Sequence, residues 1–257
     1  MRAFFRVYRN RFWRLTLFNA VYFCLTLPLL FVFYICVNAY TGIFVGDASV
    51  ADVLPGLGFF MAVFSLDTAT GRTLTLIAIA FSALLFGPLK FTLYHLEIGY
   101  FTSANRFFSE SLSALRKKLP QALLLGVLDL LVLGRTLTNL CGLFSAAWSP
   151  LLSALLRAFS LIVLLFWISF RRWMYLLSAS CALRILQILK NGFLLTVSGL
   201  GKTAQCSAAC AVIWTISFLT VPIVTVVALP LLAFSSSSLV TVCSLYPLIQ
   251  AKVCKEE

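Results

Sequence analysis

Asp129 is the acidic residue best placed to do chemistry inside an apolar part of this sequence. It lies in the middle of the stretch Gln121–Leu133, which is otherwise apolar after its first residue. A charged carboxylate in such a run is costly unless it is paired or protonated, and intramembrane acids therefore often serve proton- or cation-coupled steps. The alternative interpretation, which we favour, is a polar contact that holds helices together. Its partner would be Arg135, Asn19 or a residue of another span.

A second group of ionisable residues comprises Lys90, His95 and Glu97. Lys90 and Glu97 are seven residues apart, which places them nearly on one face of a helix, so they could pair where a span meets the cytosol. His95 could relay a proton. A lone histidine without a partner motif is, however, more often a hydrogen-bonded residue at the membrane interface.

Other reactive residue types form no recognisable reaction centre. Cys206 and Cys210 are four residues apart and share a helix face, but no histidine or acid lies near them to complete a metal site. They are better explained as small packing residues. Zincin, nucleophile-elbow, phosphate-loop and dinucleotide motifs are absent from the sequence. We therefore expect a non-enzymatic protein without a cofactor.

The elements that carry these residues are hydrophobic helices. Of the 257 residues, 61% are hydrophobic and 11% are charged, whereas soluble domains carry about a quarter charged residues. The sequence predicts an all-α, polytopic membrane bundle that forms one domain over residues 1–257. A membrane span needs about 20 mostly apolar residues. Six segments qualify: Leu15–Val37, Thr73–Tyr94, Leu119–Cys141, Leu151–Phe170, Gln205–Pro230 and the short Ser236–Lys252.

The basic residues predict the orientation. With the N-terminus in the cytoplasm and six spans, 17 of the 20 bases fall on the cytoplasmic side, as the positive-inside rule requires. Only Arg72, Arg135 and Arg157 fall on or near the outer side. Both termini are therefore predicted to be cytoplasmic. The net charge of +12 predicts an attraction to anionic lipid headgroups, and we do not expect nucleic acid as a partner.

Two basic amphipathic stretches, Asn105–Lys118 and Ala182–Leu195, are predicted to lie in the headgroup plane or to extend a span inward. The apolar stretch Val53–Leu66 is too short to span and suits an outer surface segment.

A basic stretch precedes an outward-running span three times, which suggests three helical hairpins derived from one unit. The three stretches are Arg9–Trp13, Arg116–Pro120 and Leu189–Phe193.

Four stretches together resemble the YesL-like family of small bacterial integral membrane proteins. They are Asn19 with Leu25–Pro28, Phe86–Pro88 leading into Tyr94, Arg116–Ala122 with Leu128–Leu130, and Leu183–Leu200 with Gly199–Gly201. The resemblance implies a bacterial plasma-membrane protein of a family often associated with carbohydrate uptake. It supplies no catalytic residues.

The expected function is therefore an accessory or regulatory component of a bacterial carbohydrate transport system, with transporter subunits or a second copy of the chain as partners. The alternative is a small transporter or channel in its own right. Asp129 and the prolines of the first and fifth spans would then shape its path.

Overall fold

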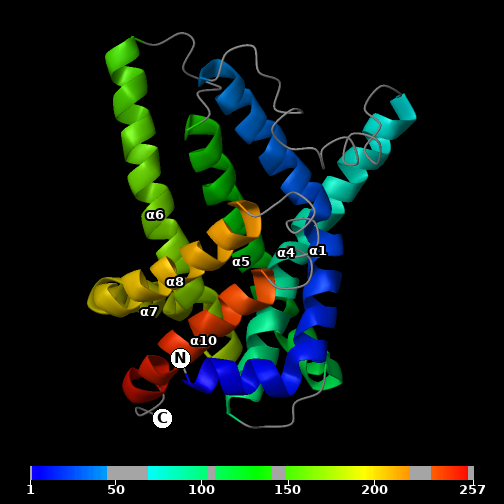
Figure 1. The fold of residues 1–257 in the computed structure, drawn as a ribbon, viewed down its shortest axis with the longest axis vertical. Coiled ribbons are helices and arrows are strands. Elements are labelled where there is room, and N and C mark those ends of the chain that lie inside the picture. Colours follow the sequence, from blue (N-terminus) through cyan, green and yellow to red (C-terminus); the bar gives the residue numbers. More distant parts are fainter. Residues whose placement is uncertain (1, 45–68, 103–107, 141–148, 220–232, 254–257) are drawn as a thin grey trace.

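The described part of the chain is all-helical. The computed structural model describes residues 2–44, 69–102, 108–140, 149–219 and 233–253. Their helices are α1 (Arg2–Phe44), α4 (Ala69–Phe101), α5 (Phe108–Leu140), α6 (Pro150–Ser180), α7 (Ile185–Ser198), α8 (Leu200–Leu219) and α10 (Phe234–Lys252) (Figure 1). The all-helical prediction is confirmed for these residues.

Four helices contain stretches that are long and apolar enough to cross a membrane: Phe4–Leu29 of α1, Thr73–Phe101 of α4, Phe108–Leu140 of α5 and Pro150–Ser180 of α6. The predicted fifth and sixth spans correspond to the shorter helices α8 and α10. Residues 220–230 of the fifth span and all of Val53–Leu66 lie outside the described residues. The beginning of α1 and the end of α10 lie at the same end of the bundle (Figure 1).

Several helices extend well past the predicted spans. α1 begins at Arg2 instead of Leu15, and α4 ends at Phe101 instead of Tyr94. α6 continues to Ser180, ten residues past the predicted end of its span at Phe170. The prediction took the next residues, Arg171–Arg172, as the cytoplasmic end of the span. Both arginines have partners inside the bundle, so the helix continues past them.

Three elbows with nearly the same backbone conformation interrupt the helices. Helical geometry breaks at Arg11 (φ −128°, ψ 18°), at Lys118 (φ −114°, ψ 16°) and at Gly199 between α7 and α8 (φ −107°, ψ 20°). The short arm before the first elbow runs across the end of the bundle before α1 turns along it (Figure 1). The predicted amphipathic stretches thus become the arms before the second and third elbows.

Burial after the three elbows follows one register. The residues four, seven, eight and eleven positions past each elbow face the interior, and only Ser207 among them is half-buried. They are Leu15, Phe18, Asn19 and Tyr22; Ala122, Leu125, Gly126 and Asp129; and Thr203, Cys206, Ser207 and Cys210. This shared register is what repetition of one helical unit would produce. The first two elbows lie within the basic stretches Arg9–Trp13 and Arg116–Pro120. The third lies eight residues after Asn191 of the third stretch, because α7 continues to Ser198.

The first two elbow residues each reach the end of the helix that returns to the same side. The Arg11 guanidinium lies over the ring of Tyr100, 5.6 Å from its centroid, near the end of α4. Lys118 Nζ donates to the carbonyl oxygens of Ser178 (2.9 Å) and Cys181 (2.7 Å) at the end of α6. Terminal carbonyls lack intrahelical donors and carry partial negative charge, so a cation there is favourable. Gly199 offers no such side chain at the third elbow.

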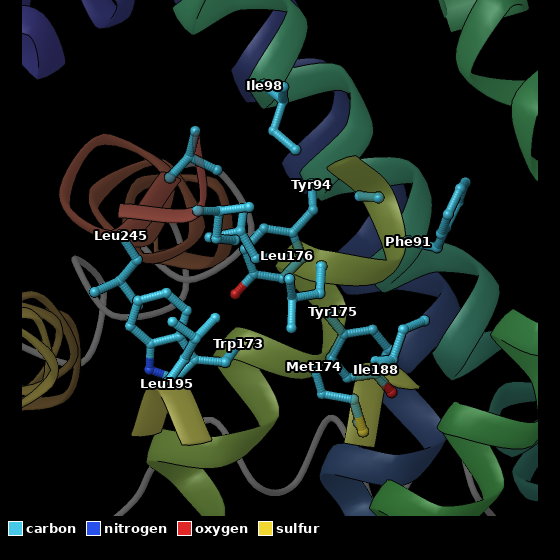
Figure 2. Close-up of a cluster of buried hydrophobic side chains, with 14 of the residues drawn as sticks. Phe91, Tyr94, Ile98, Trp173, Met174, Tyr175, Leu176, Ile188, Leu195 and Leu245 are labelled. Carbon is cyan, nitrogen blue, oxygen red and sulfur yellow. The ribbon is translucent and has the colours of Figure 1, made fainter. Parts of the chain in front are cut away.

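The main hydrophobic core is built on the second half of α6. Trp173, Met174, Leu176 and Leu177 are completely buried there. They pack with α4, α7 and α10, from which Phe91, Ile188 and Leu245 point into the same cluster (Figure 2). By contrast, the first half of α6 exposes its apolar side chains, Phe159 among them. In a bilayer such a surface faces lipid or another membrane helix.

α4 and α5 approach each other backbone to backbone at two glycines. A Cβ built on Gly87 would lie 2.0 Å from the carbonyl oxygen of Ala122 and 2.8 Å from Gly126 Cα. A Cβ on Gly126 would lie 2.7 Å from Gly87 Cα. Glycine is therefore required on both helices, as is common where membrane helices approach backbone to backbone.

Alanine at either glycine should force these two helices apart. We expect Gly87→Ala and Gly126→Ala each to lower the free energy of unfolding by about 1–3 kcal/mol, the usual range for overpacking. Gly134→Ala on the same helix is the matched control, because a Cβ there meets nothing within 4 Å. Unfolding by SDS in mixed micelles measures the difference. An equal loss in Gly134→Ala would contradict this account of the crossing.

Candidate functional site

Asp129 holds α5 to α6 through two side chains. Its Oδ2 lies 3.0 Å from a guanidinium nitrogen of Arg171, and its Oδ1 accepts a hydrogen bond of 2.8 Å from Trp167 Nε1. The Asp129 side chain is fully buried and that of Arg171 is 15% exposed. The partner is thus a residue of another span, one of the three predicted possibilities, and not Arg135 or Asn19.

This ion pair lies deep in the bundle. Asp129 is eleven residues past the elbow at Lys118, and Arg171 is nine residues before the end of α6 at Ser180. At 1.5 Å per residue Arg171 lies about 14 Å and Asp129 about 16 Å along its own helix from that end. The prediction that placed Arg171 on the cytoplasmic side stays a prediction, and the structure shows that its side chain has a partner within the bundle.

Arg172 points to a different neighbour, α8. It donates to Ser207 Oγ at 2.7 Å and approaches Cys206 Sγ at 3.8 Å. Cys206 and Cys210 in turn face α10, where their sulfur atoms lie 3.6 Å and 4.0 Å from Thr241 Oγ1. Among the residues that the structure describes, no group of three or more His, Cys, Asp or Glu could hold a metal ion. The two cysteines act as small polar packing residues between α6, α8 and α10.

Lys90 does not pair with Glu97. Its ammonium group lies over the rings of Phe86 and Tyr175, 5.5 and 5.8 Å from their centroids. The Arg171 guanidinium lies over the same Phe86 ring, 5.6 Å from its centroid, so Lys90 lies close to the Asp129–Arg171 pair. The expected ion pair is wrong because α4 continues past Tyr94 and leaves Lys90 inside the bundle.

Glu97 and His95 each bind a serine on another helix. Glu97 is completely buried and its Oε1 accepts a hydrogen bond of 2.6 Å from Ser238 Oγ on α10. His95 Nδ1 lies 3.1 Å from Ser111 Oγ on the arm of α5, and its ring stacks on Phe91. Both contacts fasten α4 to a neighbour.

Asn19 caps a helix that lies 216 residues away in sequence. Its Oδ1 accepts a hydrogen bond of 2.7 Å from the backbone N–H of Ser235 in the first turn of α10. The N-cap residue Ala233 makes no side-chain cap of its own. The first N–H groups of a helix need such acceptors, and a carboxamide oxygen is a preferred one.

The five predicted residues therefore do not converge on one reaction centre. Asp129 and Lys90 both lie near Arg171, whereas Asn19, His95 and Glu97 serve separate contacts. Sequence reasoning missed Arg171 and Trp167, and nothing in their spacing from Asp129 reveals the pairing. It also missed the glycine crossing, for which the four-residue spacing of Ala122 and Gly126 was an available signal.

Loss of Arg171 should be more damaging than loss of the whole ion pair. Arg171→Met leaves the Asp129 carboxylate buried without its counter-charge, and we expect a loss of about 3–5 kcal/mol in the free energy of unfolding. Asp129→Asn/Arg171→Met should recover part of that loss, because no buried charge then lacks a partner. Unfolding in mixed micelles measures both. Arg135→Met, at an exposed position of α5, is the control, and a loss as large there would refute the role of the pair.

Comparison of the chain with protein-family models, with curated proteins and with solved structures found no match. The resemblance to the YesL-like family therefore remains a prediction from the quoted motifs.

Proposed function

We propose that this chain is a non-enzymatic, six-span membrane protein of the bacterial plasma membrane, with both termini in the cytoplasm. In this proposal it acts as an accessory or regulatory component of a carbohydrate transport system. The observation that favours an accessory role is that its buried polar groups bind other parts of the same chain. Asp129, Glu97 and Asn19 are each bonded to another helix of the same chain. Polar groups that bind another helix of the same chain in this way stabilise a scaffold.

The exposed first half of α6 is evidence for a partner within the membrane. Along the first half of α6, Leu151, Phe159 and Ile162 are each at least 64% exposed. A helix that stands apart from the core in this way offers its apolar surface to lipid or to a helix of another protein. The link to carbohydrate transport comes from the family resemblance alone, which is an argument by analogy.

Purification of a tagged chain from native membranes in mild detergent tests the accessory role. We expect subunits of a carbohydrate transporter to co-purify, and deletion of the gene to reduce uptake of the corresponding sugar. Phe159→Ser/Ile162→Ser on α6 should weaken the association, whereas Leu131→Ser on the exposed face of α5 is a control. Normal sugar uptake in the deletion strain, together with the absence of transporter subunits, would exclude this function.

One observation favours the second candidate, a small transporter in its own right. Lys90 forms no close ion pair among the described residues, and its ammonium group lies over the ring of Phe86, which the Arg171 guanidinium also approaches. An ammonium group inside a membrane bundle without a close ion pair is uncommon, and such residues often mark substrate and ion pathways.

Purified protein in liposomes would then carry a solute flux that Asp129→Asn reduces at least tenfold. The control is Arg135→Gln on the same helix, which should leave the flux unchanged. Full flux in Asp129→Asn would remove this residue from any transport mechanism.

A further inference from the structure

The first elbow encloses a basic hollow. Its volume is about 460 Å³, and six consecutive residues line it, from Arg9 to Arg14. Three of the six are arginines and none is acidic. A concave surface with several guanidinium groups and no carboxylate favours an anionic ligand, and a phosphate matches the fork of an arginine side chain.

The hollow lies where a surface helix turns into a spanning one. The arm before it runs across the end of the bundle, and α1 then enters the apolar stretch that ends at Leu29 (Figure 1). Trp13 is 80% exposed and packs edge to face on Phe12, with ring centroids 5.5 Å apart. Exposed tryptophan beside arginine is typical of the level of the lipid headgroups.

Two of the three arginines that line the hollow contact Tyr100 of α4. Arg11 lies over the ring of Tyr100, and Arg14 donates to the hydroxyl of the same tyrosine. Arg9 is exposed on the other side of the elbow residue. The tyrosine thus fixes one wall of the hollow, and Arg9 supplies the other.

The other two elbows lack this pair of cations. Two positions before the elbow residue, the first elbow has Arg9, the second has Arg116 and the third has Val197. Three positions after it, the corresponding residues are Arg14, Gln121 and Lys202. Gln121 donates to the carbonyl oxygen of Leu183, so at the second elbow that position serves an internal contact. Only the first elbow has a base on both sides.

We propose that the hollow at the first elbow binds the phosphate of an anionic phospholipid, with Arg9 and Arg14 as its ligands and Trp13 beside the acyl chain. The proposal is independent of the function proposed above, because a scaffold and a transporter would both keep this lipid. It distinguishes one specific lipid site from the general attraction of a basic protein to an anionic leaflet.

Native mass spectrometry of the full-length protein tests this, with phosphatidylglycerol and phosphatidylcholine added in equal amounts. We expect wild-type protein to retain phosphatidylglycerol preferentially. Arg9→Gln/Arg14→Gln should bind it at least tenfold more weakly, because both charge-assisted hydrogen bonds to the phosphate are lost. The matched control is Arg116→Gln/Lys117→Gln, which removes the same charge from the second elbow and should bind as wild type does.

Two milder variants show whether a loss of lipid binding reflects the site itself or a failure of the protein to fold. Arg9→Gln alone changes an exposed side chain and should show a smaller loss, whereas Arg9→Lys/Arg14→Lys should retain most of the binding. Equal losses in the two double glutamine variants would show a diffuse charge effect and overturn the proposal. Equal retention of phosphatidylcholine would also overturn it, and so would displacement of the lipid by an equal concentration of inorganic phosphate.

Discussion

The backbone contact between Gly87 and Gly126 is the constraint on which the rest of the bundle depends. Helices in a bilayer gain little from hydrophobic association, because lipid is as apolar as the helix surface, and close packing must supply the attraction. The two glycines bring α4 and α5 together more closely than side chains would allow. Asp129 and Lys90 each lie three residues beyond the crossing glycine of their own helix. Lipid and water have little room there, so Asp129 needs an internal partner, and α6 supplies it.

The sequence predicts the helices well because the relevant physics is local. A run of apolar residues such as Leu119–Leu133 is recognisable without any knowledge of its neighbours, and so is the change from a basic stretch to a span. Boundaries were less predictable. Arg171 and Arg172 read as the end of a span because a charge usually marks the membrane surface, yet Asp129 and Ser207 keep both arginines inside. That choice depends on contacts 42 and 35 residues away in sequence, which no local pattern contains.

The same limit applies to the candidate residues. Their types indicated that each needs a partner, and the partners came from other helices: Ser238 for Glu97, Ser111 for His95 and the backbone of Ser235 for Asn19. The repeated burial pattern after the elbows shows that similar backbone geometry can be built from different residues. Three elbows of nearly equal backbone geometry carry Arg11, Lys118 and Gly199, so one framework has kept its shape while its chemistry diverged. The first two elbows hold the returning helix by a cation, and the third, at a glycine, has no side chain for this.

The arginines of α6 also have a consequence for the assembly of the protein in the cell. If α6 crosses the membrane as proposed, each arginine within it makes insertion less favourable, by up to roughly 2.5–3.5 kcal/mol at the centre of a span, and α6 carries two in succession. The carboxylate that neutralises Arg171 belongs to α5, which is synthesised earlier. If α5 is still beside the translocon when α6 emerges, the pair can enter the lipid as one hairpin with its charges already matched. The order of the two helices along the chain therefore suits biosynthesis as well as the final packing.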